Sequence, residues 1–340
     1  MIRRHRVLLA VSFLFTSYGM VAHAAPTPVT VRTFPRAETD RYFKDIVAGA
    51  GLGRFHHIRS PVSVDSQGVI RMNRDTFYSP AVFDLDAGPV TVTLPDGGGR
   101  FMSLMPVNED HYAWPVVYGP GKFTFTRKQL GTRYAGLLVR TFADPNDEKD
   151  IATARALQDQ IRVEQAAPGK FEVPDWDKVS LDKIRGALLL LGSMEGEPGA
   201  RFGRKDEVDP ISHLIATAGG WGGNPNEAAV YDGVFPAAND GVTVHRLTVR
   251  DVPVDGFWSI TVYNTDGFMQ KNDLGVYSLN NVTAKHAADG SYTIQFGGCG
   301  PGVDNCIPIF KGWNYLVRMY RPRKPILDGT WKFPKPQPVR

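Results

Sequence analysis

Two long stretches of the chain alternate apolar and polar residues with a period of two, and this alternation constrains the fold more than any other feature. In residues 90–94, Val and Leu alternate with Thr, a Gly-rich turn follows at 95–99, and residues 100–107 return as a second strand. The pattern covers about 62–142 and resumes from 228 to 320. Together with 35 Gly and 25 Pro among 340 residues, it favours short strands joined by turns over a helix bundle.

Helices are expected before and between these blocks, where apolar residues recur at helical spacing. These stretches are residues 42–50, 151–161, 181–191 and 211–218. Ser180 is the expected N-cap of the third, and Asp209 with Pro210 starts the fourth. The pair Asp289-Gly290 predicts a hairpin that joins residues 282–286 to 291–296. The sequence therefore predicts a mainly β protein, with a β-sandwich followed by a jelly-roll or related double-sheet domain.

The first 24 residues have the pattern of a secretory signal peptide. Basic residues at positions 3–6 precede an apolar run, and Ala22-His23-Ala24 forms a small-x-small cleavage site. The alternative is a membrane anchor, but the run falls short of the ~20 apolar residues that span a bilayer. We therefore expect a periplasmic or secreted protein with no membrane span after cleavage of the signal.

The charge balance gives no support to a nucleic-acid partner. The leader holds three arginines and no acidic residue, which leaves 36 Lys and Arg against 35 Asp and Glu in the rest of the chain. Arg318, Arg321, Arg323 and Lys324 are the nearest thing to a basic cluster. They alternate with Tyr and Pro, so we expect a solvated edge strand there and exclude nucleic acid.

A dense polar segment lies directly before an apolar strand of the first block. It contains Asn73, Arg74, Asp75, Thr76 and Tyr78. In an extended chain Arg74, Thr76 and Tyr78 share one face. Such a face can bind a polar ligand, or it can form a buried hydrogen-bond network that locks two layers together. Both interpretations stay open at this point.

A second dense segment surrounds Trp221, which has two glycines on each side. The glycines allow a close approach of the backbone, and an exposed indole can stack on a sugar or another flat ligand. The alternative is a helix end that runs into a tight loop, with Trp221 as part of the core.

The common catalytic motifs of hydrolases and phosphate-binding enzymes are missing from the sequence. The segment Glu109-Asp110-His111 could join His56 or His57 in a metal site, but we favour a solvated loop and expect no metal and no cofactor. The remaining catalytic candidates are Asp75 or Glu109 as a general base, with Tyr78 or His111 as the acid.

Cys299 and Cys306 flank a short segment that contains Gly300, Pro301 and Gly302. An exported protein with two cysteines across a turn is expected to form a disulfide. The alternative, a redox or metal-binding dithiol, lacks the C-x-x-C spacing.

Several ordered motifs resemble a bacterial family of two joined domains. Residues 73–79 and 84–90 are similar to Domain of Unknown Function 1254, and residues 220–231, 257–264 and 327–334 are similar to Domain of Unknown Function 1214. The resemblance covers about residues 38–338, and it implies an N-terminal immunoglobulin-like β-sandwich, a C-terminal jelly roll and no established activity.

On this basis we expect four segments along the chain. They are a signal peptide at 1–24, a β-sandwich domain with a leading helix at 25–145, a helical linker at 146–205 and a jelly-roll domain at 206–340.

The expected function is to bind a small polar or carbohydrate-like ligand at the domain junction. Whether the protein also converts that ligand stays open. The predicted ligand-binding residues are Asn73, Arg74, Asp75, Thr76, Tyr78, Trp221, Tyr231, Asn264 and Asn272. Two alternatives stay open: a hydrolase with a carboxylate base, and an envelope structural or assembly protein without a small-molecule site. The sequence leaves open whether the protein forms an oligomer.

Overall fold

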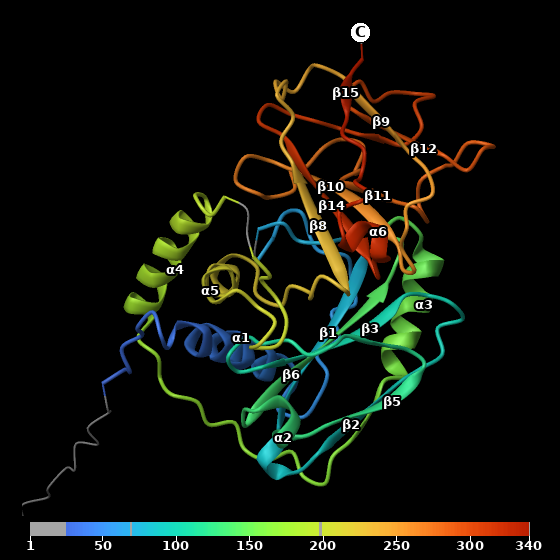
Figure 1. The fold of residues 1–340 in the computed structure, drawn as a ribbon. Helices are drawn as coiled ribbons and strands as arrows, with labels where there is room; N and C mark the ends of the chain where they lie inside the picture. The colour runs from blue at the N-terminus through green and yellow to red at the C-terminus, as the bar shows by residue number, and fades with distance from the viewer. Residues whose placement is uncertain (1–24, 69, 197–198, 340) are drawn as a thin grey trace, which may run out of the picture.

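The computed structural model describes residues 25–68, 70–196 and 199–339, so the predicted signal peptide lies outside the described residues. Within these ranges the chain forms four β-sheets and six α-helices (Figure 1). The prediction of a mainly β protein with connecting helices is confirmed. No helix in these ranges has the length and apolar character needed to cross a membrane.

The N-terminal half contains two sheets that enclose one apolar core. Four antiparallel strands form the first sheet, in the order β1 (Thr76–Asp84), β6 (Tyr134–Phe142), β3 (Met102–Asn108), β4 (Val117–Tyr118). The second sheet has the order β5 (Gly121–Phe125), β2 (Val90–Leu94), β7 (Arg162–Glu164). Side chains from both sheets and from α3 (Glu148–Asp159) form the core between them, because the alternating apolar residues of each strand face inward.

The C-terminal half repeats the arrangement of two sheets around a core. One sheet has the order β11 (Ser278–Asn280), β10 (Trp258–Tyr263), β14 (Asn314–Tyr320), β8 (Ala229–Val234). The other has the order β13 (Cys306–Ile307), β12 (Tyr292–Phe296), β9 (His245–Val249), β15 (Gln337–Pro338). Stacked aromatic rings of Phe296, Trp313 and Tyr315 lie in this core and are fully buried.

Three helices form a separate layer beside the strands. They are α1 (Phe34–Ala50), α4 (Lys178–Gly192) and α5 (Pro210–Gly219), which pack against one another (Figure 1). Their apolar contact consists of residues such as Phe34, Leu181, Leu188 and Ile215. Shorter helical segments are η1 (Leu85–Ala87), α2 (Arg127–Leu130) and α6 (Lys324–Leu327).

The start of α5 confirms a local prediction, whereas the start of α4 corrects one. The Asp209 carboxylate accepts hydrogen bonds from the first turn of α5, and Pro210 occupies the first helical position. Helix α4 begins one turn earlier than expected, because Asp177 caps it. Ser180 lies inside the helix, and its hydroxyl accepts a hydrogen bond from the backbone N–H of Val29.

The predicted hairpin around Asp289-Gly290 is wrong. Gly290 does form a turn, but β11 ends at Asn280 and belongs to a different sheet from β12. A two-residue turn signal fixes only the local bend, whereas the pairing of the flanking segments depends on the core that each one joins.

Candidate functional site

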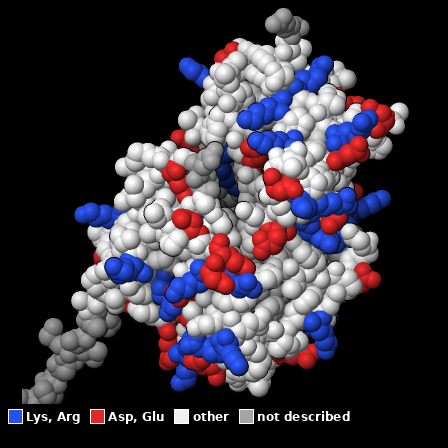
Figure 2. All heavy atoms as spheres, viewed as in Figure 1, with Lys and Arg blue, Asp and Glu red and all other residues white. Residues whose placement is uncertain are grey.

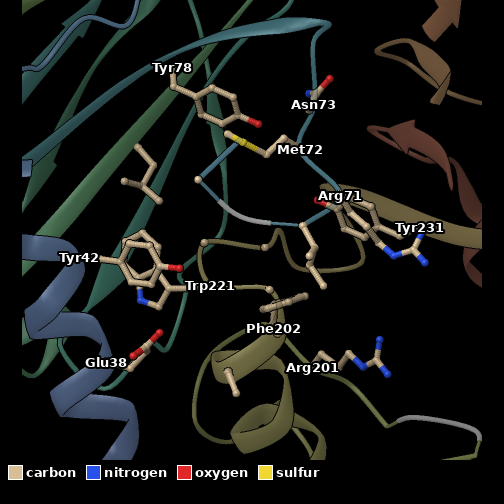
Figure 3. Close-up of a pocket in the computed structure, with 18 of the residues that line it drawn as sticks. Glu38, Tyr42, Arg71, Met72, Asn73, Tyr78, Arg201, Phe202, Trp221 and Tyr231 are labelled. Carbon is tan, nitrogen blue, oxygen red and sulfur yellow. The ribbon is translucent and has the colours of Figure 1, made fainter. Parts of the chain in front are cut away.

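A cavity of about 1340 Å³ lies between the helical layer and two of the sheets, the one that contains β1 and β6 and the one that contains β8 and β14. Its walls come from α1, the segment before β1, β6, α4, the loops around 199–202 and 218–226, and strands β8 and β14. On the face drawn in Figure 2 the surface is hollowed, and Lys or Arg side chains are visible inside the hollow. Figure 3 shows side chains from distant parts of the chain pointing into this space.

Arg140 is a buried cation in the wall of the cavity. It lies on β6 directly opposite Tyr78 on β1, and its guanidinium carbon lies 5.1 Å from the centre of the Tyr78 ring. Only 7% of Arg140 is exposed. One terminal nitrogen, Nη2, donates a 2.6 Å hydrogen bond to the carbonyl oxygen of Gly222, but Nε has no partner. Among the described residues no carboxylate pairs with Arg140 within 4.0 Å.

Arg318 is a second buried cation, and it lies on the sheet that contains β8 and β14. Its position corrects the expectation that this segment is a solvated edge strand. It lies on β14, an inner strand between β10 and β8, opposite Tyr231. The side chain is 3% exposed, and its terminal nitrogens donate to Thr261 Oγ1 at 2.9 Å and Tyr263 Oη at 2.7 Å. A third hydrogen bond, of 2.7 Å, joins it to the carbonyl oxygen of Arg71.

Three tyrosines surround Arg140. They are Tyr78, Tyr231 and Tyr320, and all three line the cavity. The hydroxyl of Tyr320 accepts a 3.0 Å hydrogen bond from Asn73 Nδ2. Burial raises the pKa of Tyr320 well above its usual value, so this hydroxyl stays neutral. Tyr320 therefore supplies a hydroxyl group but no negative charge to balance the arginines.

Charged residues on the helical side of the cavity are paired with one another, apart from the exposed Lys44. The Glu38 carboxylate on α1 binds Arg41 at 2.9 Å and also Arg185 of α4. Arg201 binds Glu195 at 2.6 Å. Arg140 and Arg318 differ, because they face the cavity with no carboxylate within 4.0 Å among the described residues.

Aromatic side chains form the wall next to α1. The Tyr42 and Trp221 rings stack with centres 4.2 Å apart and an angle of 13° between their planes. In Figure 3 this stack lies on one side of the cavity, and Arg71 and Tyr231 lie on the other. Nε1 of Trp221 donates a 3.1 Å hydrogen bond to Thr39 Oγ1, so the indole is held in place by α1.

Four of the predicted ligand-binding residues line the cavity. They are Asn73, Tyr78, Trp221 and Tyr231.

Three others from the first polar segment lie outside the cavity wall. Arg74 is half-buried and donates to the carbonyl oxygen of Val62. Asp75 is fully buried and accepts a 2.9 Å hydrogen bond from Asn280 Nδ2. Thr76 is also buried, and its hydroxyl lies 3.2 Å from Asn73 Nδ2. Of these three residues, Asp75 binds the C-terminal half through Asn280, and the Arg74 guanidinium lies 5.3 Å from the ring centre of Tyr277 in the same half.

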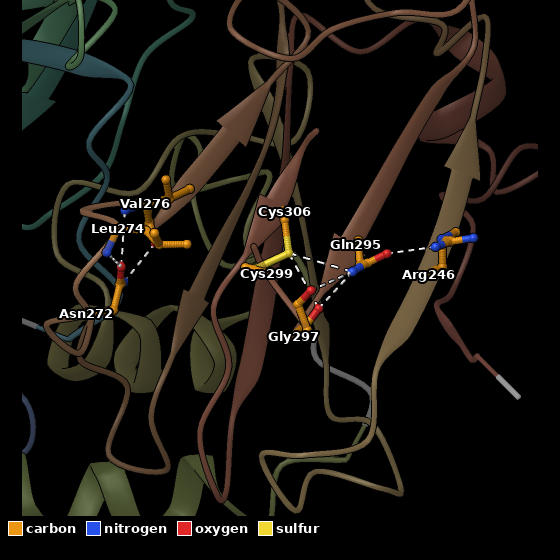
Figure 4. Close-up of a disulfide and its surroundings, with 9 residues drawn as sticks. Arg246, Asn272, Leu274, Val276, Gln295, Gly297, Cys299 and Cys306 are labelled. Carbon is orange, nitrogen blue, oxygen red and sulfur yellow. Dashed lines mark hydrogen bonds between the residues drawn. A yellow bond between two sulfur atoms is a disulfide. The ribbon is translucent and has the colours of Figure 1, made fainter. Parts of the chain in front are cut away.

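Asn264 and Asn272 organise their own loops. The side-chain oxygen of Asn264 accepts hydrogen bonds from the backbone N–H groups of Asp266 and Phe268. Asn272 binds the backbone of Leu274 and Val276 in the same way (Figure 4). Neither residue lines the cavity.

His111 is buried with both ring nitrogens in use. The backbone N–H of Gly222 donates to Nε2 at 2.9 Å, so Nδ1 carries the proton and donates to Thr217 Oγ1 at 2.8 Å. Burial lowers the pKa of His111 well below its usual value. Glu109 accepts a 2.9 Å hydrogen bond from the backbone of Tyr134, and burial raises its pKa. Neither residue reaches the large cavity.

No three His, Cys, Asp or Glu side chains in the described ranges are grouped so that they could hold a metal ion.

A disulfide joins Cys299 and Cys306, as predicted, with Cα atoms 5.5 Å apart. It fixes the start of β13 beside the end of β12, where the two strands pair in parallel (Figure 4). Neither cysteine lines the cavity.

Comparisons with known families agree with this two-part architecture. Residues 52–165 match the family described as a protein of unknown function, DUF1254, and residues 236–324 match a second one, DUF1214. The chain thus carries a DUF1254 match followed by a DUF1214 match, in the predicted order. Arg140 and Tyr78 lie in the DUF1254 match, whereas Arg318 lies in the DUF1214 match and Trp221 between the two. The cavity therefore takes its walls from both parts.

Solved structures that are similar to this chain are known. The VPA0106 protein from Vibrio parahaemolyticus is 20% identical, with a TM-score of 0.69 over 91% of this chain and 98% of that chain. An uncharacterized protein from Burkholderia cenocepacia is 15% identical, with a TM-score of 0.49 over 86% of each chain. The first likeness supports the fold. A comparison with curated proteins gives no match.

Sequence reasoning missed the residues that give the cavity its charge. Arg140 and Arg318 each stand alone in a run of apolar residues on a strand. A single arginine within such a run was the available signal, because a buried strand tolerates a cation only with a specific partner. Nothing comparable in the sequence identified Glu38 and Tyr42 of α1 as residues of the cavity wall.

Proposed function

We propose that this DUF1254–DUF1214 protein is an exported protein that binds a small, negatively charged molecule in the cavity. Arg140 carries the proposal. A buried guanidinium without a counter-ion costs several kcal/mol, on the order of 3–5, which a bound anion would offset. Its planar donors match a carboxylate or phosphate group. Arg318 lies on the facing sheet and adds a second positive charge to the same space.

The other polar groups of the wall suit a ligand that also carries hydroxyl groups. The hydroxyls of Tyr78 and Tyr231 and the amide of Asn73 lie in the same wall as Arg140. Such neutral groups exchange hydrogen bonds with sugar-like hydroxyls, and they do so without repelling an anion. Export is supported by the leader pattern and by the disulfide, which is typical of oxidising compartments.

Binding accounts for the site better than hydrolysis does. The carboxylates of the cavity wall, Glu38 and Asp182, are both engaged with basic side chains. Asp75, Glu109 and His111 do not reach the cavity. An acid and a base facing one reacting group are therefore missing from the described wall. A purely structural role would leave the burial of Arg140 without an explanation.

The test uses calorimetry on the full chain with succinate, glucuronate, benzoate, inorganic phosphate and neutral glucose. The charged probes should bind and glucose should not, and Arg140→Gln should weaken binding at least about tenfold. Arg246→Gln is the matched control, because Arg246 is exposed on β9 outside the cavity. Equal binding of glucose and glucuronate, or an unchanged affinity in Arg140→Gln, would contradict the proposal.

A further inference from the structure

The cavity is larger than a small polar anion requires. Its volume of about 1340 Å³ exceeds the range of about 300–1,000 Å³ that is usual for pockets of drug-sized ligands. The cavity arginines without a carboxylate within 4.0 Å are, among the described residues, Arg140 on β6, Arg318 on β14 and Arg71 in the segment before β1, and none of them belongs to the helical layer. The ligand must therefore have a second part that fills the remaining space.

Apolar side chains form a large part of the wall on the helical side. Helix α1 contributes Ile46 and the stack of Tyr42 on Trp221, and α4 contributes Leu181 and Leu189. Most of the charged residues on this side are paired, as the Glu38 contacts with Arg41 and Arg185 show. The aromatic stack and the leucines of α4 thus lie across the cavity from Arg140 and Arg318, so a ligand with a charged head group and an apolar chain can contact both.

The apolar surface continues from the cavity to the outside at the end of α4. Leu189 lines the cavity and is 44% exposed. The residues that follow it, Leu190, Leu191 and Met194, are exposed to an even greater extent. Such a run of exposed apolar side chains is uncommon on a soluble surface, and here it lies next to the cavity.

We propose that the ligand is an aliphatic carboxylate whose head group binds Arg140 and Arg318, and whose hydrocarbon chain lies along α1 and α4. This inference rests on the proposed function and narrows the class of anion. Burial of a methylene group in an apolar wall raises the association constant by up to about fourfold. Affinity should therefore rise steeply with the length of the chain.

The experiment is calorimetry on the full chain with hexanoate, octanoate, decanoate and dodecanoate, each below its micelle concentration. The matching primary alcohols test the head group. Leu189→Glu places a negative charge on the apolar wall, and the adjacent Leu190→Glu is the control because Leu190 is exposed and does not line the cavity. Both positions are partly or largely exposed, so a charge there does not disrupt the core.

The proposal expects affinity to rise with each step of the series, the alcohols to bind at least about tenfold more weakly, and Leu189→Glu to weaken dodecanoate far more than hexanoate. Leu190→Glu should resemble the unmodified chain. If all four acids bind equally and Arg140→Gln still abolishes binding, the protein binds anions but the aliphatic assignment is wrong. If no acid binds and succinate, glucuronate, benzoate and phosphate also fail, both proposals are overturned.

Discussion

Asp75 accepts a 2.9 Å hydrogen bond from Nδ2 of Asn280, and this contact joins the start of β1 to the end of β11. Both side chains are almost completely buried. The second carboxyl oxygen of Asp75 has no partner among the described residues, and burial raises the pKa of this group. This polar contact lies in a buried junction between the DUF1254 and DUF1214 parts. Removal of either partner would therefore leave the other with an unsatisfied buried polar group.

Asn280→Asp should destabilise the protein in a pH-dependent way. The substitution keeps an acceptor for the backbone N–H groups of Val282 and Thr283 but removes the donor to Asp75 and adds a second carboxyl. We expect the free energy of unfolding to fall by about 2–4 kcal/mol at neutral pH. Part of this loss should be recovered near pH 4, where a shared proton restores the hydrogen bond. Urea unfolding at both pH values measures this, with Asn146→Asp on an exposed turn as control. A loss of equal size at both pH values would contradict the prediction.

Asp40 on α1 makes the protein less stable at neutral pH. Burial is the main cause that raises the pKa of Asp40 to about 6; the hydrogen bond from Trp176 opposes this shift, and the nearby charge of Glu109 contributes to it. A raised pKa in the folded state means that stability is greatest below about pH 4 and falls as the pH rises through 6. Ionisation of this group therefore costs roughly 3 kcal/mol at neutral pH.

Asp40→Asn should remove that cost and keep the acceptor for Trp176. We expect the variant to be more stable than the unmodified protein by up to about 3 kcal/mol at pH 7.5, with little difference near pH 4. Chemical denaturation at the two pH values provides the measurement, and the exposed Asp273→Asn serves as the control. A gain that does not change with pH would mean that ionisation of Asp40 is not the cause.

Replacing both cysteines with serine should lower stability without changing ligand binding. The disulfide closes a short loop between positions 299 and 306, and the loss of this restraint on the unfolded chain corresponds to about 2–3 kcal/mol. The cavity wall does not include either cysteine. Denaturation and calorimetry on the same variant separate the two effects. A loss of anion binding with unchanged stability would instead indicate a redox role for the pair.

His111 should stay neutral throughout the physiological range. Its Nε2 accepts from Gly222 and its pKa is lowered by burial, so protonation would break a buried hydrogen bond. Nitrogen-detected NMR of the imidazole should show the Nδ1-protonated form down to about pH 5. The imidazole resonances of the urea-unfolded protein serve as the reference. Protonation of His111 above about pH 5 would return it to the list of candidate acids.

Local sequence signals identified individual helices and strands, but they did not predict how these elements pair and pack against one another. The Asp209-Pro210 start of α5 depends on groups within one turn, so the sequence was sufficient to predict it. The hairpin at Asp289-Gly290 failed because the partner of β12 is chosen by the C-terminal core. Pairing across sheets depends on the whole chain, and a short motif carries no information about it.

The candidate site shows the same limit. Asn73, Tyr78, Trp221 and Tyr231 lie in segments whose composition is unusual, and all four line the cavity. Arg74 and Asp75 belong to the same unusual segment as Asn73 and Tyr78, yet they contact the C-terminal half and do not line the cavity. Alternation along a strand separates the two faces, but the sequence does not tell which face meets the cavity and which meets the other sheet.

The origin of the two cavity arginines in separate parts of the chain has an evolutionary consequence. Arg140 belongs to the DUF1254 match and Arg318 to the DUF1214 match. A recombinant gene that exchanged one part for an unrelated version could preserve both sheets and still lose one of the two arginines that we propose to bind the anion. Under that proposal, selection would act on the two parts as a single heritable unit, and it would penalise every crossover that separates them.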